Sequence, residues 1–407
     1  MTVGMSLRET LKNIPAARRL NAAVKGPLQA LAATRSQWKY EWRARASGGH
    51  ALEDPELWKA VRSRIAARRE GRPPAAIGEL HLFLAYPLAN WEAVLPVAFA
   101  PFGRVTVFEW RSLGFDDRAP DWASRRDAMN RAMLAAFDDA QSVRPVDAVV
   151  GYLSGHNTAP ETLREMAGRG AAVFNFCWDD KLNFPGPRVG GRYSTPAAIA
   201  SSVDLTLTNA PASVVKYAVH GGLAVFAPEA ALPSLHRPHE VPFEFDVSFV
   251  GARYGWRPQF IERLARRGVL VECFGRGWPN GPLSDEEMVR LYSRSRINLG
   301  FGGVGYSRSL VCLKGRDFEV PMSGGLYLTQ ENPELRLVFD VGREVVTYRD
   351  ERDCARKIRH LLDHPDEAAR IREAGRERAL RDHTYLARWG SVFRQAGLLS
   401  ENRCHAA

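Results

Sequence analysis

The stretch LKGRDFEVPMSGGLYLTQENPEL, from Leu313 to Leu335, has side chains suited to an anionic ligand that also carries hydroxyl groups. Its pattern predicts a helix that starts near Lys314, and the free N–H groups of a helix start favour negative charge. Arg316 and Glu319 are three residues apart and therefore share one helix face. We expect Lys314 and Arg316 to bind a diphosphate and Glu319 to accept hydrogen bonds from a vicinal diol. An internal Arg316–Glu319 ion pair that only supports the fold is the alternative.

Glycine and arginine residues at a second place suit the same chemistry. In FVGARYGWRP, Gly251 directly follows a predicted strand, and Arg253 and Arg257 precede a predicted helix. Glycine lets the backbone approach an anion, and arginine adds bidentate contacts; an ordinary strand-to-helix turn is the alternative. The run GFGGVG (300–305) formally matches GxGxxG, but it follows an inner strand and precedes no clear helix. We therefore expect Gly303 to lie in a loop close to the ligand, and we do not assign a dinucleotide fingerprint.

Three side chains are candidates for a general base. Asp179 and Asp180 in FNFCWDDKLNF follow a buried strand, at the carboxyl end where the sites of α/β proteins form. A carboxylate there could take a proton from an acceptor hydroxyl; the alternative is that one of the two caps the following turn. His156 in YLSGHNTAP lies at another predicted strand end and is either a base or a polar loop residue.

Parallel strands separated by helices must position these residues. Short apolar runs predict strands, and amphipathic stretches lie between several of them; the runs are 80–86, 104–110, 146–152, 171–178, 203–209, 223–228, 246–251, 269–275, 296–301, 325–330 and 344–349. Strands that are apolar throughout imply sheets covered on both faces. We predict an α/β protein with Rossmann-like domains at 76–235 and 236–385 that face each other across a cleft, followed by a C-terminal helix and tail at 386–407.

Residues 1–75 carry almost all of the net charge. They contain fifteen Lys or Arg and six Asp or Glu, which is +9 of the chain's +10. Their composition predicts a basic helical extension, and the run RPP at 72–74 predicts a linker. In SQWKYEWRARAS, Trp38, Tyr40 and Trp42 alternate with basic residues, which suits an anionic membrane surface. RNA stacking and a solvated helix packed on the first domain are the alternatives.

The remaining composition bears on the cellular compartment. The five cysteines are odd in number, widely spaced and never form CxxC, which is typical of free thiols in a reducing cytoplasm. No run approaches the roughly 18 apolar residues of a transmembrane helix, and the first residues lack an apolar signal region. We expect a cytoplasmic protein, with peripheral contact at the inner face of an anionic membrane as a further option.

The run at 313–335, followed by FDVGREVVTYRDERDCARKIRHLLDHPDE and ALRDHTYLARW, resembles the C-terminal domain of CgeB-type glycosyltransferases, a group named after a spore maturation protein. DVSFVGARYGWRPQFIERL and FGRGWPNGPLS resemble the start of the same domain. The similarity covers about residues 145–395. It implies the GT-B fold of two Rossmann-like domains, with a nucleotide-sugar donor held by the C-terminal one.

The resemblance also assigns roles to residues. It implies that Glu319 is the ribose-binding glutamate and that Lys314 and Arg316 hold the diphosphate. Val311 stands where the broader GT-B pattern has a second glutamate, so backbone groups of the loop at 302–307 would take over contacts with the donor sugar.

The function that this resemblance implies is transfer of a sugar from a nucleotide-sugar donor, expected to be a UDP-sugar, to a hydroxyl of a glycan, lipid or protein acceptor. Asp179 and Asp180 resemble a metal-binding DxD site, but GT-B enzymes generally need no bound metal, so we expect no metal and no cofactor beyond the donor. A nucleotide-sugar epimerase on the same fold is one alternative, and a non-catalytic binding module recruited by the basic extension is another. No nucleic-acid partner is expected.

Overall fold

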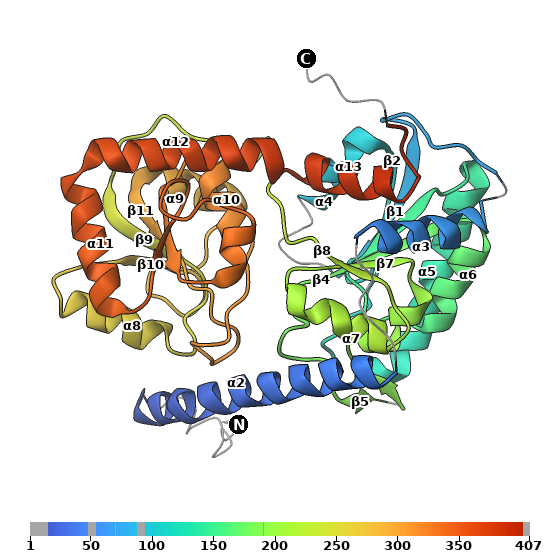
Figure 1. The fold of residues 1–407 in the computed structure, drawn as a ribbon, viewed down its shortest axis with the longest axis horizontal. Coiled ribbons are helices and arrows are strands. Elements are labelled where there is room, and N and C mark those ends of the chain that lie inside the picture. Colours follow the sequence, from blue (N-terminus) through green and yellow to red (C-terminus); the bar gives the residue numbers. More distant parts are fainter. Residues whose placement is uncertain (1–14, 48–53, 70, 88–93, 190, 402–407) are drawn as a thin grey trace, which may run out of the picture. The chain divides into compact units, whose positions relative to one another are not determined.

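The protein is described by a computed structural model that covers residues 15–47, 54–69, 71–87, 94–189 and 191–401, with side chains from residue 24 onward. Residues 1–14 and Cys404, which the sequence arguments used, lie outside these ranges. The chain divides into two compact units (Figure 1). We call residues 36–232 together with 384–401 the N-terminal unit, and residues 233–383 together with 15–35 the C-terminal unit.

The N-terminal unit is built on a six-stranded parallel sheet in the order β2-β1-β3-β4-β7-β8. The strands are β1 (Leu80–Tyr86), β2 (Gly103–Glu109), β3 (Ala148–Gly151), β4 (Ala172–Cys177), β7 (Leu205–Thr208) and β8 (Ala224–Phe226), with a small antiparallel pair of β5 (Arg188–Val189) and β6 (Arg192–Tyr193) beside them. Each apolar run predicted in this part of the chain therefore forms a strand. The strand order changes direction between β1 and β3: β2 lies on one side of β1, and β3 with the later strands lies on the other side.

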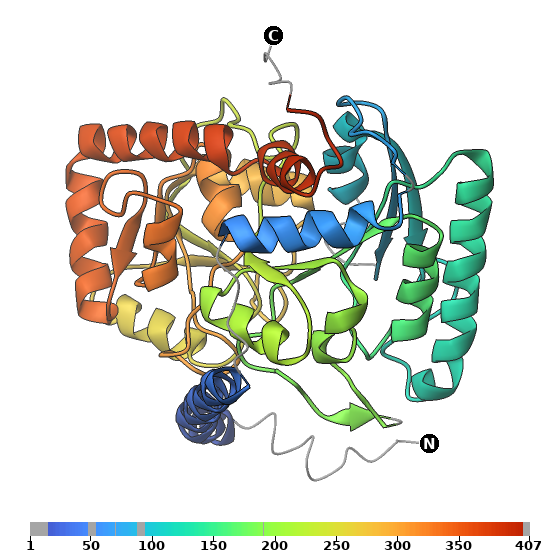
Figure 2. The ribbon, with the colours of Figure 1, turned by 45° about the vertical axis from the view of Figure 1, so that its right-hand side comes forward.

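Helices cover both faces of this sheet, and its central strands are therefore buried throughout. Alternate side chains such as Phe83 pack against α5 (Trp122–Val143), which lies beside α6 (Pro160–Gly168) in Figure 2. On the opposite face, Phe174 contacts Trp389 and Phe393 of α13 (Tyr385–Gln395), and Phe99 of α4 (Leu95–Phe99) joins them. The C-terminal helix predicted as a separate segment at 386–407 thus completes the core of the N-terminal unit.

Residues 36–75 also belong to the N-terminal unit, whereas the sequence predicted a separate extension over 1–75. The helix α3 (Asp54–Ala66) buries Leu57, Trp58, Val61 and Ile65 at the usual helical spacing. Just after it, Arg69 forms a buried ion pair with Asp147, at 2.9 Å. The strand-like bridge from Ala75 to Leu399 follows, so the segment predicted as a linker is held on both sides. The composition predicted a basic helical extension, with a helix packed on the first domain among the alternatives, and the burial of α3 agrees with that alternative.

The C-terminal unit is built on a five-stranded parallel sheet in the order β10-β9-β11-β12-β13. Its strands are β9 (Phe245–Val250), β10 (Glu272–Phe274), β11 (Ser295–Leu299), β12 (Tyr327–Gln330) and β13 (Val346–Tyr348), which are the strands predicted from the sequence. The order changes direction between β9 and β11. Both units are therefore open parallel α/β sheets, as predicted.

Helices also cover both faces of the second sheet. Val247 and Phe249 on β9 point toward α8 (Arg257–Ala265) and α11 (Glu351–Asp363). Their neighbour Ser248 points the other way, where Asn298 donates a hydrogen bond to the end of α9 (Asp285–Arg294). On this second side, α10 (Arg316–Met322) packs against β12, and α12 (Pro365–Asp382) packs on α10 (Figure 1).

The remaining elements are one long helix and several short ones. The helix α2 runs over Pro15–Ala46, and the boundary between the units falls within it. The short α7 (Val214–Val219) precedes β8, and 3-10 helices occupy Ala100–Phe102, Pro196–Ala198, Ala200–Ser202, Pro211–Ser213 and Pro333–Leu337. Within the described ranges, no helix combines the length and the apolar character that crossing a bilayer requires. Cys177, Cys273, Cys312 and Cys354 are buried free thiols.

Candidate functional site

The C-terminal unit brings most of the residues predicted for ligand binding to one edge of its sheet. In open α/β sheets, ligands bind beyond the carboxyl ends of the strands at the point where the strand order changes direction. Here that point lies between β9 and β11. Gly251 follows β9 directly, and the loop after β11 leads to α10, which carries Arg316 and Glu319. Topology alone therefore explains why segments far apart in the sequence meet here.

Gly251 has a backbone conformation that other residues rarely adopt, with φ at 154°. A Cβ atom at this position would lie 2.8 Å from the Phe249 ring and 3.4 Å from Nη1 of Arg316. The turn is held in place by two hydrogen bonds. The Gly251 N–H donates to the Phe274 carbonyl, and Trp278 Nε1 donates to the Gly251 carbonyl, both at 2.8 Å. Glycine is therefore required for the arginine to lie directly against the backbone after β9.

Two arginine side chains share the Phe249 ring at this turn. The guanidinium carbon of Arg257 lies 5.6 Å from the ring centre and that of Arg316 lies 5.7 Å from it. Arg257 also stacks 4.2 Å over Tyr254 and donates from Nη1 to the Ala252 carbonyl. Among the described residues, neither arginine forms an ion pair with a carboxylate, and Nε of Arg316 is buried without a hydrogen-bond partner. Two adjacent cations held on one aromatic ring form an anion-binding arrangement.

The electrostatics of Arg257 reflect this arrangement. Only 5% of its surface is exposed. Burial, together with the positive charge of Arg316, lowers the pKa of Arg257 to about 10. The guanidinium is still protonated at neutral pH, so the protein holds two like charges close together at a cost in stability. A bound anion would remove that cost.

Glu319 lies one turn along α10 from Arg316, but the two side chains do not form an ion pair within the described part of the chain. The interpretation of these residues as a structural ion pair is therefore wrong. The Glu319 carboxylate instead folds back over Gly315, where a Cβ atom would lie 2.7 Å from Oε1. Burial raises the pKa of Glu319 to about 7, although the charge of Arg316 opposes the shift. The carboxylate is thus poised to accept hydrogen bonds and has no partner in the described protein.

The start of α10 differs from the prediction in a way that changes the source of the positive potential. The helix begins at Arg316, with Gly315 as its N-cap, and has only seven residues. The backbone N–H of Lys314 donates to Asp317 Oδ2, and the Tyr327 hydroxyl donates to Asp317 Oδ1, each at 2.7 Å. Burial raises the pKa of Asp317 to about 6. The short helix contributes little dipole, so the arginines supply the charge that attracts an anion.

Two other predicted residues have a clear structural setting. Arg253 is exposed, and its guanidinium lies 5.4 Å over the Trp278 ring, a different ring from the one that carries Arg257 and Arg316. Gly303 is buried beside Trp256, where a Cβ atom would lie 2.8 Å from the indole nitrogen and 2.6 Å from the Ser307 carbonyl. Gly303 therefore lets its loop close tightly after β11, which is a packing reason for glycine at this position.

In the N-terminal unit, Asp179 follows β4 and is exposed. Its Oδ2 accepts a 2.7 Å hydrogen bond from the Tyr152 hydroxyl, which comes from the end of the neighbouring strand β3. Burial holds the pKa of Tyr152 well above 10, so the phenol remains a donor. Asp179 is consequently oriented by one hydrogen bond while its other oxygen is left toward solvent, a setting that suits a general base.

Asp180, by contrast, is 1% exposed and points into the core. Its Oδ2 accepts a 2.7 Å hydrogen bond from Tyr217, and burial raises the pKa of its carboxyl. The amine of Lys216 donates to the Asp180 and Lys181 carbonyls, and burial lowers the pKa of Lys216 to about 8. The two adjacent aspartates therefore have different environments. Asp180 is buried and accepts a hydrogen bond from Tyr217, which is a structural setting but not the turn cap that the sequence left open.

His156 lies in the loop after β3, close to the point where the order of the first sheet changes direction. Its Nε2 is 2.7 Å from the Asp117 carbonyl, and its own carbonyl accepts from Trp122 Nε1 at 2.8 Å. A ring nitrogen that faces a carbonyl must carry the proton there. That nitrogen cannot act as a base without breaking the contact, which leaves Nδ1 for any catalytic role.

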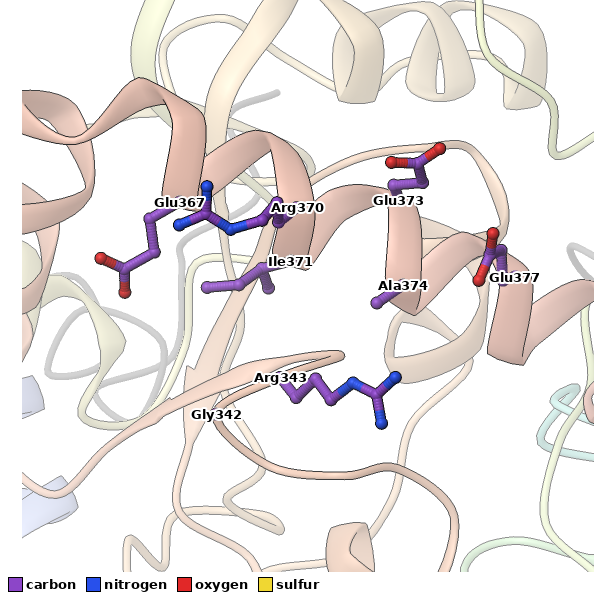
Figure 3. A pocket seen from close by; sticks show the side chains of 8 residues that line it. All are labelled: Gly342, Arg343, Glu367, Arg370, Ile371, Glu373, Ala374 and Glu377. Carbon is purple, nitrogen blue, oxygen red and sulfur yellow. The ribbon is translucent and has the colours of Figure 1, made fainter.

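The structure has hollows elsewhere that contain none of the predicted residues. One lies between α12 and the loop at Gly342–Arg343 (Figure 3), and it is lined by Gly342, Arg343, Glu367, Arg370, Ile371, Glu373, Ala374 and Glu377. On α12 its charged side chains are Glu367, Arg370, Glu373 and Glu377, so acidic and basic groups are mixed. Nothing in this arrangement selects a ligand, and we assign it no role. Within the described ranges, no three His, Cys, Asp or Glu side chains gather to hold a metal ion.

Several side chains of these sites did not emerge from the sequence. Phe249 and Tyr254 form the platform for the arginines, and Tyr152 orients Asp179. Asp317 was not among the predicted residues, although it organises the start of α10. Aromatic residues at strand ends were the available signal, but an apolar run does not reveal which of its members faces a ligand.

Comparison with known proteins bears on these sites. Residues 257–393 match the model of a family described as glycosyl transferase-like, a segment that contains Arg257, Arg316 and Glu319. A comparison with curated protein sequences found no match.

Solved structures are similar to most of the chain. Sucrose-phosphate synthase from Thermosynechococcus elongatus is 12% identical with a TM-score of 0.54, over 77% of this chain and 98% of that one. HepE from Anabaena in complex with UDP is 12% identical with a TM-score of 0.53, over 77% and 98%. A glycosyltransferase from Rickettsia africae is 11% identical with a TM-score of 0.54, over 80% and 100%. The chain therefore has the GT-B fold of these proteins, and residues 257–393 are similar to the glycosyl transferase-like family.

Proposed function

We propose that the protein is a glycosyltransferase that transfers a sugar from a UDP-sugar to an acceptor hydroxyl. The observation that carries this proposal is the pair of arginines on Phe249, Arg257 and Arg316. Arg316 lies against Gly251, and neither arginine has a carboxylate partner among the described residues. Beside them, Glu319 has a carboxylate without a partner among the described residues. An anion site next to a hydrogen-bond acceptor suits a nucleoside diphosphate, whose phosphates and ribose diol are joined in one molecule.

Each of these residues has a role in the proposed reaction. The arginines bind the diphosphate and stabilise the negative charge that develops on it as the bond to the sugar breaks. Glu319 accepts hydrogen bonds from the ribose hydroxyls and fixes the orientation of the donor. Lys314 adds positive charge beside them. A uracil base is supported by HepE, whose structure contains UDP. The finer assignment to the CgeB-type group rests on the sequence runs quoted above.

The N-terminal unit is proposed to supply the acceptor side. Asp179 takes the proton of the acceptor hydroxyl, the oxygen of that hydroxyl forms the new bond to the sugar, and UDP leaves with the electron pair of the broken bond. Tyr152 holds Asp179 in one orientation. Asp180 is not given a catalytic role because its carboxylate is enclosed by the core. His156 remains the second candidate base, through Nδ1. We propose that neither a metal ion nor another cofactor takes part.

The test is UDP binding and turnover in a matched set of variants. Arg316→Gln and Arg257→Gln should each weaken UDP binding by about tenfold to a hundredfold, the loss of one charge-assisted contact. Arg266→Gln is the control, because Arg266 is exposed at the end of α8 and far along the helix from Arg257. Uridine binding should fall less than UDP binding in the arginine variants. Unchanged UDP affinity in both Arg316→Gln and Arg257→Gln would contradict the proposed donor site.

Turnover separates this function from the alternatives. The wild-type chain is incubated with a panel of nucleotide sugars, with and without candidate acceptors, and released UDP is measured. Release that depends on an acceptor supports a transferase. Conversion of the donor without an acceptor points to an epimerase, and binding without any turnover points to a binding module.

A further inference from the structure

The helix α2 has two opposite faces in its described part, residues 24–46. One face is buried and carries small residues and one aromatic ring: Gly26, Ala33, Tyr40 and Ala44. The other carries the exposed apolar side chains Val24, Leu28, Leu31, Trp38 and Trp42. At about 100° per residue, these five lie within an arc of about 80°, centred opposite the buried face. They form a stripe about 27 Å long that faces away from the protein.

The aromatic residues of this segment divide between the two faces. Trp38 and Trp42 are 78% and 68% exposed. Tyr40 is buried, and its hydroxyl lies 3.0 Å from Nε2 of His220. The sequence had grouped all three as one basic-aromatic motif, but the structure leaves only the tryptophans available to a partner.

The charges beside the stripe are of one sign. Lys25, Arg35, Lys39, Arg43 and Arg45 are exposed. Glu41, the single acidic residue in the sequence of α2, is half-buried and accepts a hydrogen bond from Gln37. Arg35 lies within the stripe, and Lys39 and Arg45 lie at about 60° to either side of its centre. The exposed apolar stripe is thus bordered by cations over residues 35–45 and has Lys25 near its other end, while residues 26–34 carry no cation.

These features select one kind of partner. A second copy of α2 would bring five cations against five cations, which repel one another. A nucleic acid would use the cations and could stack bases on Trp38 and Trp42, but it has no use for the aliphatic Val24, Leu28 and Leu31. An anionic bilayer uses all three: aliphatic side chains enter the acyl boundary, indole rings lie at the headgroups, and cations meet anionic lipid.

We propose that the exposed face of α2 docks the protein on the surface of an anionic lipid bilayer. The helix lies in the plane of the interface, with the stripe inward and the cations among the headgroups. Its buried face remains on the protein, so docking requires no unfolding. This inference does not depend on the identity of the sugar donor.

Sedimentation of the full chain with vesicles tests the proposal. Vesicles of equal parts phosphatidylcholine and phosphatidylserine should bind the protein, and vesicles of phosphatidylcholine alone should bind it at least about tenfold more weakly, because each cation near an anionic surface contributes. Trp38→Ser combined with Trp42→Ser should reduce binding to the mixed vesicles by about tenfold or more. On binding, the tryptophan fluorescence of the wild-type chain should shift to the blue, and the shift should be lost in this variant.

Two matched variants control for general loss of apolar surface and of charge. Leu113→Ser with Leu270→Ser removes two exposed apolar side chains elsewhere, and Arg266→Gln with Arg290→Gln removes two exposed cations outside α2. Both should bind vesicles like the wild type. Arg35→Gln with Lys39→Gln should bind about tenfold more weakly. All variants alter exposed residues, so their melting temperatures should stay close to that of the wild type.

Three results would overturn the proposal. The first is equal vesicle binding by the wild type and the double tryptophan variant. The second is a dimer in solution that the tryptophan substitutions dissociate while vesicle binding is absent, which would assign the stripe to a second copy. The third is tight binding to single-stranded RNA without binding to anionic vesicles.

Discussion

Glu319 is placed where its charge is unfavourable to the empty protein. Burial raises the pKa of its carboxyl to about 7, against an ordinary value of 4.5, and no described residue pairs with it. A residue selected for stability would be paired or replaced by an uncharged one. A residue that binds a ligand can remain unpaired, because the ligand supplies the missing donors. Stability and binding should therefore respond in opposite directions when this charge is removed.

Replacement of Glu319 by glutamine tests that opposition. Glu319→Gln should weaken uridine binding by about tenfold to a hundredfold, since a charge-assisted hydrogen bond is lost. At pH 8 the melting temperature of the empty variant should equal or exceed that of the wild type, because an unpaired buried charge is gone. Calorimetric titration and a thermal scan measure the two effects. A lower melting temperature of Glu319→Gln together with normal uridine binding would show that Glu319 supports the fold and does not bind the ligand.

The free energy of unfolding of the ligand-free protein should also depend on pH through Glu319. Because the folded pKa of Glu319 lies above its unfolded value, the folded chain binds more protons between about pH 4.5 and 7, and stability is lost as the pH rises through that window. Asp317, raised from 3.8 to about 6, adds a loss over the lower part of the window. Unfolding by urea at a series of pH values measures this slope. The slope between pH 6 and 7 should be smaller in Glu319→Gln, and identical slopes would contradict the assignment.

Asp179 and Asp180 are neighbours in the sequence but should behave as different kinds of residue. Asp179→Asn removes an exposed base and should lower transfer by about 10²- to 10⁴-fold, with UDP affinity and melting temperature unchanged. Asp180→Asn alters a buried carboxyl and should lower the melting temperature. Steady-state transfer, UDP titration and thermal scans of both variants separate the two. A selective loss of transfer in His156→Ala, with normal transfer in Asp179→Asn, would move the base to His156.

At the scale of elements, the strand ends and the short helix α10 place the proposed donor-binding groups. The turn after β9 needs Gly251 because the Arg316 guanidinium lies against it, and the first turn of α10 needs Gly315 because the Glu319 carboxylate folds over it. Pro321 is accommodated in the last turn, and Gly324, with φ at 71°, ends the helix as its position in the sequence predicts. The glycines at these two positions thus leave room for the side chains of Arg316 and Glu319.

Gly315→Ala should reduce ligand binding without adding or removing any charged group. The new methyl would lie 2.7 Å from Glu319 Oε1, so the carboxylate must swing away from its position. Because the obstructing atom is the end of a flexible side chain, the cost in stability should be small while uridine affinity falls by about tenfold. Gly168→Ala is the control, since a methyl there meets nothing within 4 Å. Equal uridine affinity in Gly315→Ala and the wild type would show that the position of this carboxylate is unimportant.

At the scale of the whole molecule, each unit is assembled from segments that are not contiguous in the chain. The N-terminal unit takes residues 36–232 and then the last helix, α13, whose Trp389 and Phe393 pack against Phe174 and Phe99. All proposed donor-binding residues belong to the C-terminal unit. Damage to α13 should therefore affect stability and leave donor binding intact.

Phe393→Ala tests this division. Phe393 is fully buried, and its loss should destabilise the N-terminal unit by about 3–5 kcal/mol. UDP affinity at a temperature below the unfolding transition should stay within about twofold of the wild type. Leu386→Ala is the matched control on the same helix, because Leu386 is exposed and its removal should change the melting temperature little. A large loss of UDP affinity in Phe393→Ala would show that the two units are not independent.

The strands, the parallel sheets and the residues around Gly251 and Glu319 were predictable from the sequence. Fully apolar runs and strand-to-helix glycines are local signals, and the change in strand order then brings together the residues after β9 and β11. Local signals could not show that Arg316 leaves Glu319 unpaired, because spacing along a helix places two side chains on one face without fixing their rotamers.

Only the tertiary structure decided which polar and aromatic residues are buried. Asp179 and Asp180 are adjacent, yet one is exposed and the other enclosed, because Asp180 meets the buried hydroxyl of Tyr217 while Asp179 meets that of Tyr152 at the surface. Residues 36–75 are basic in composition, yet Trp58 and Val61 complete a core, since burial depends on what packs against a helix face. For the same reason Tyr40 is covered while Trp38 and Trp42 are not. Composition records which residues are present, and contacts between distant segments determine which of them remain available to a ligand or a membrane.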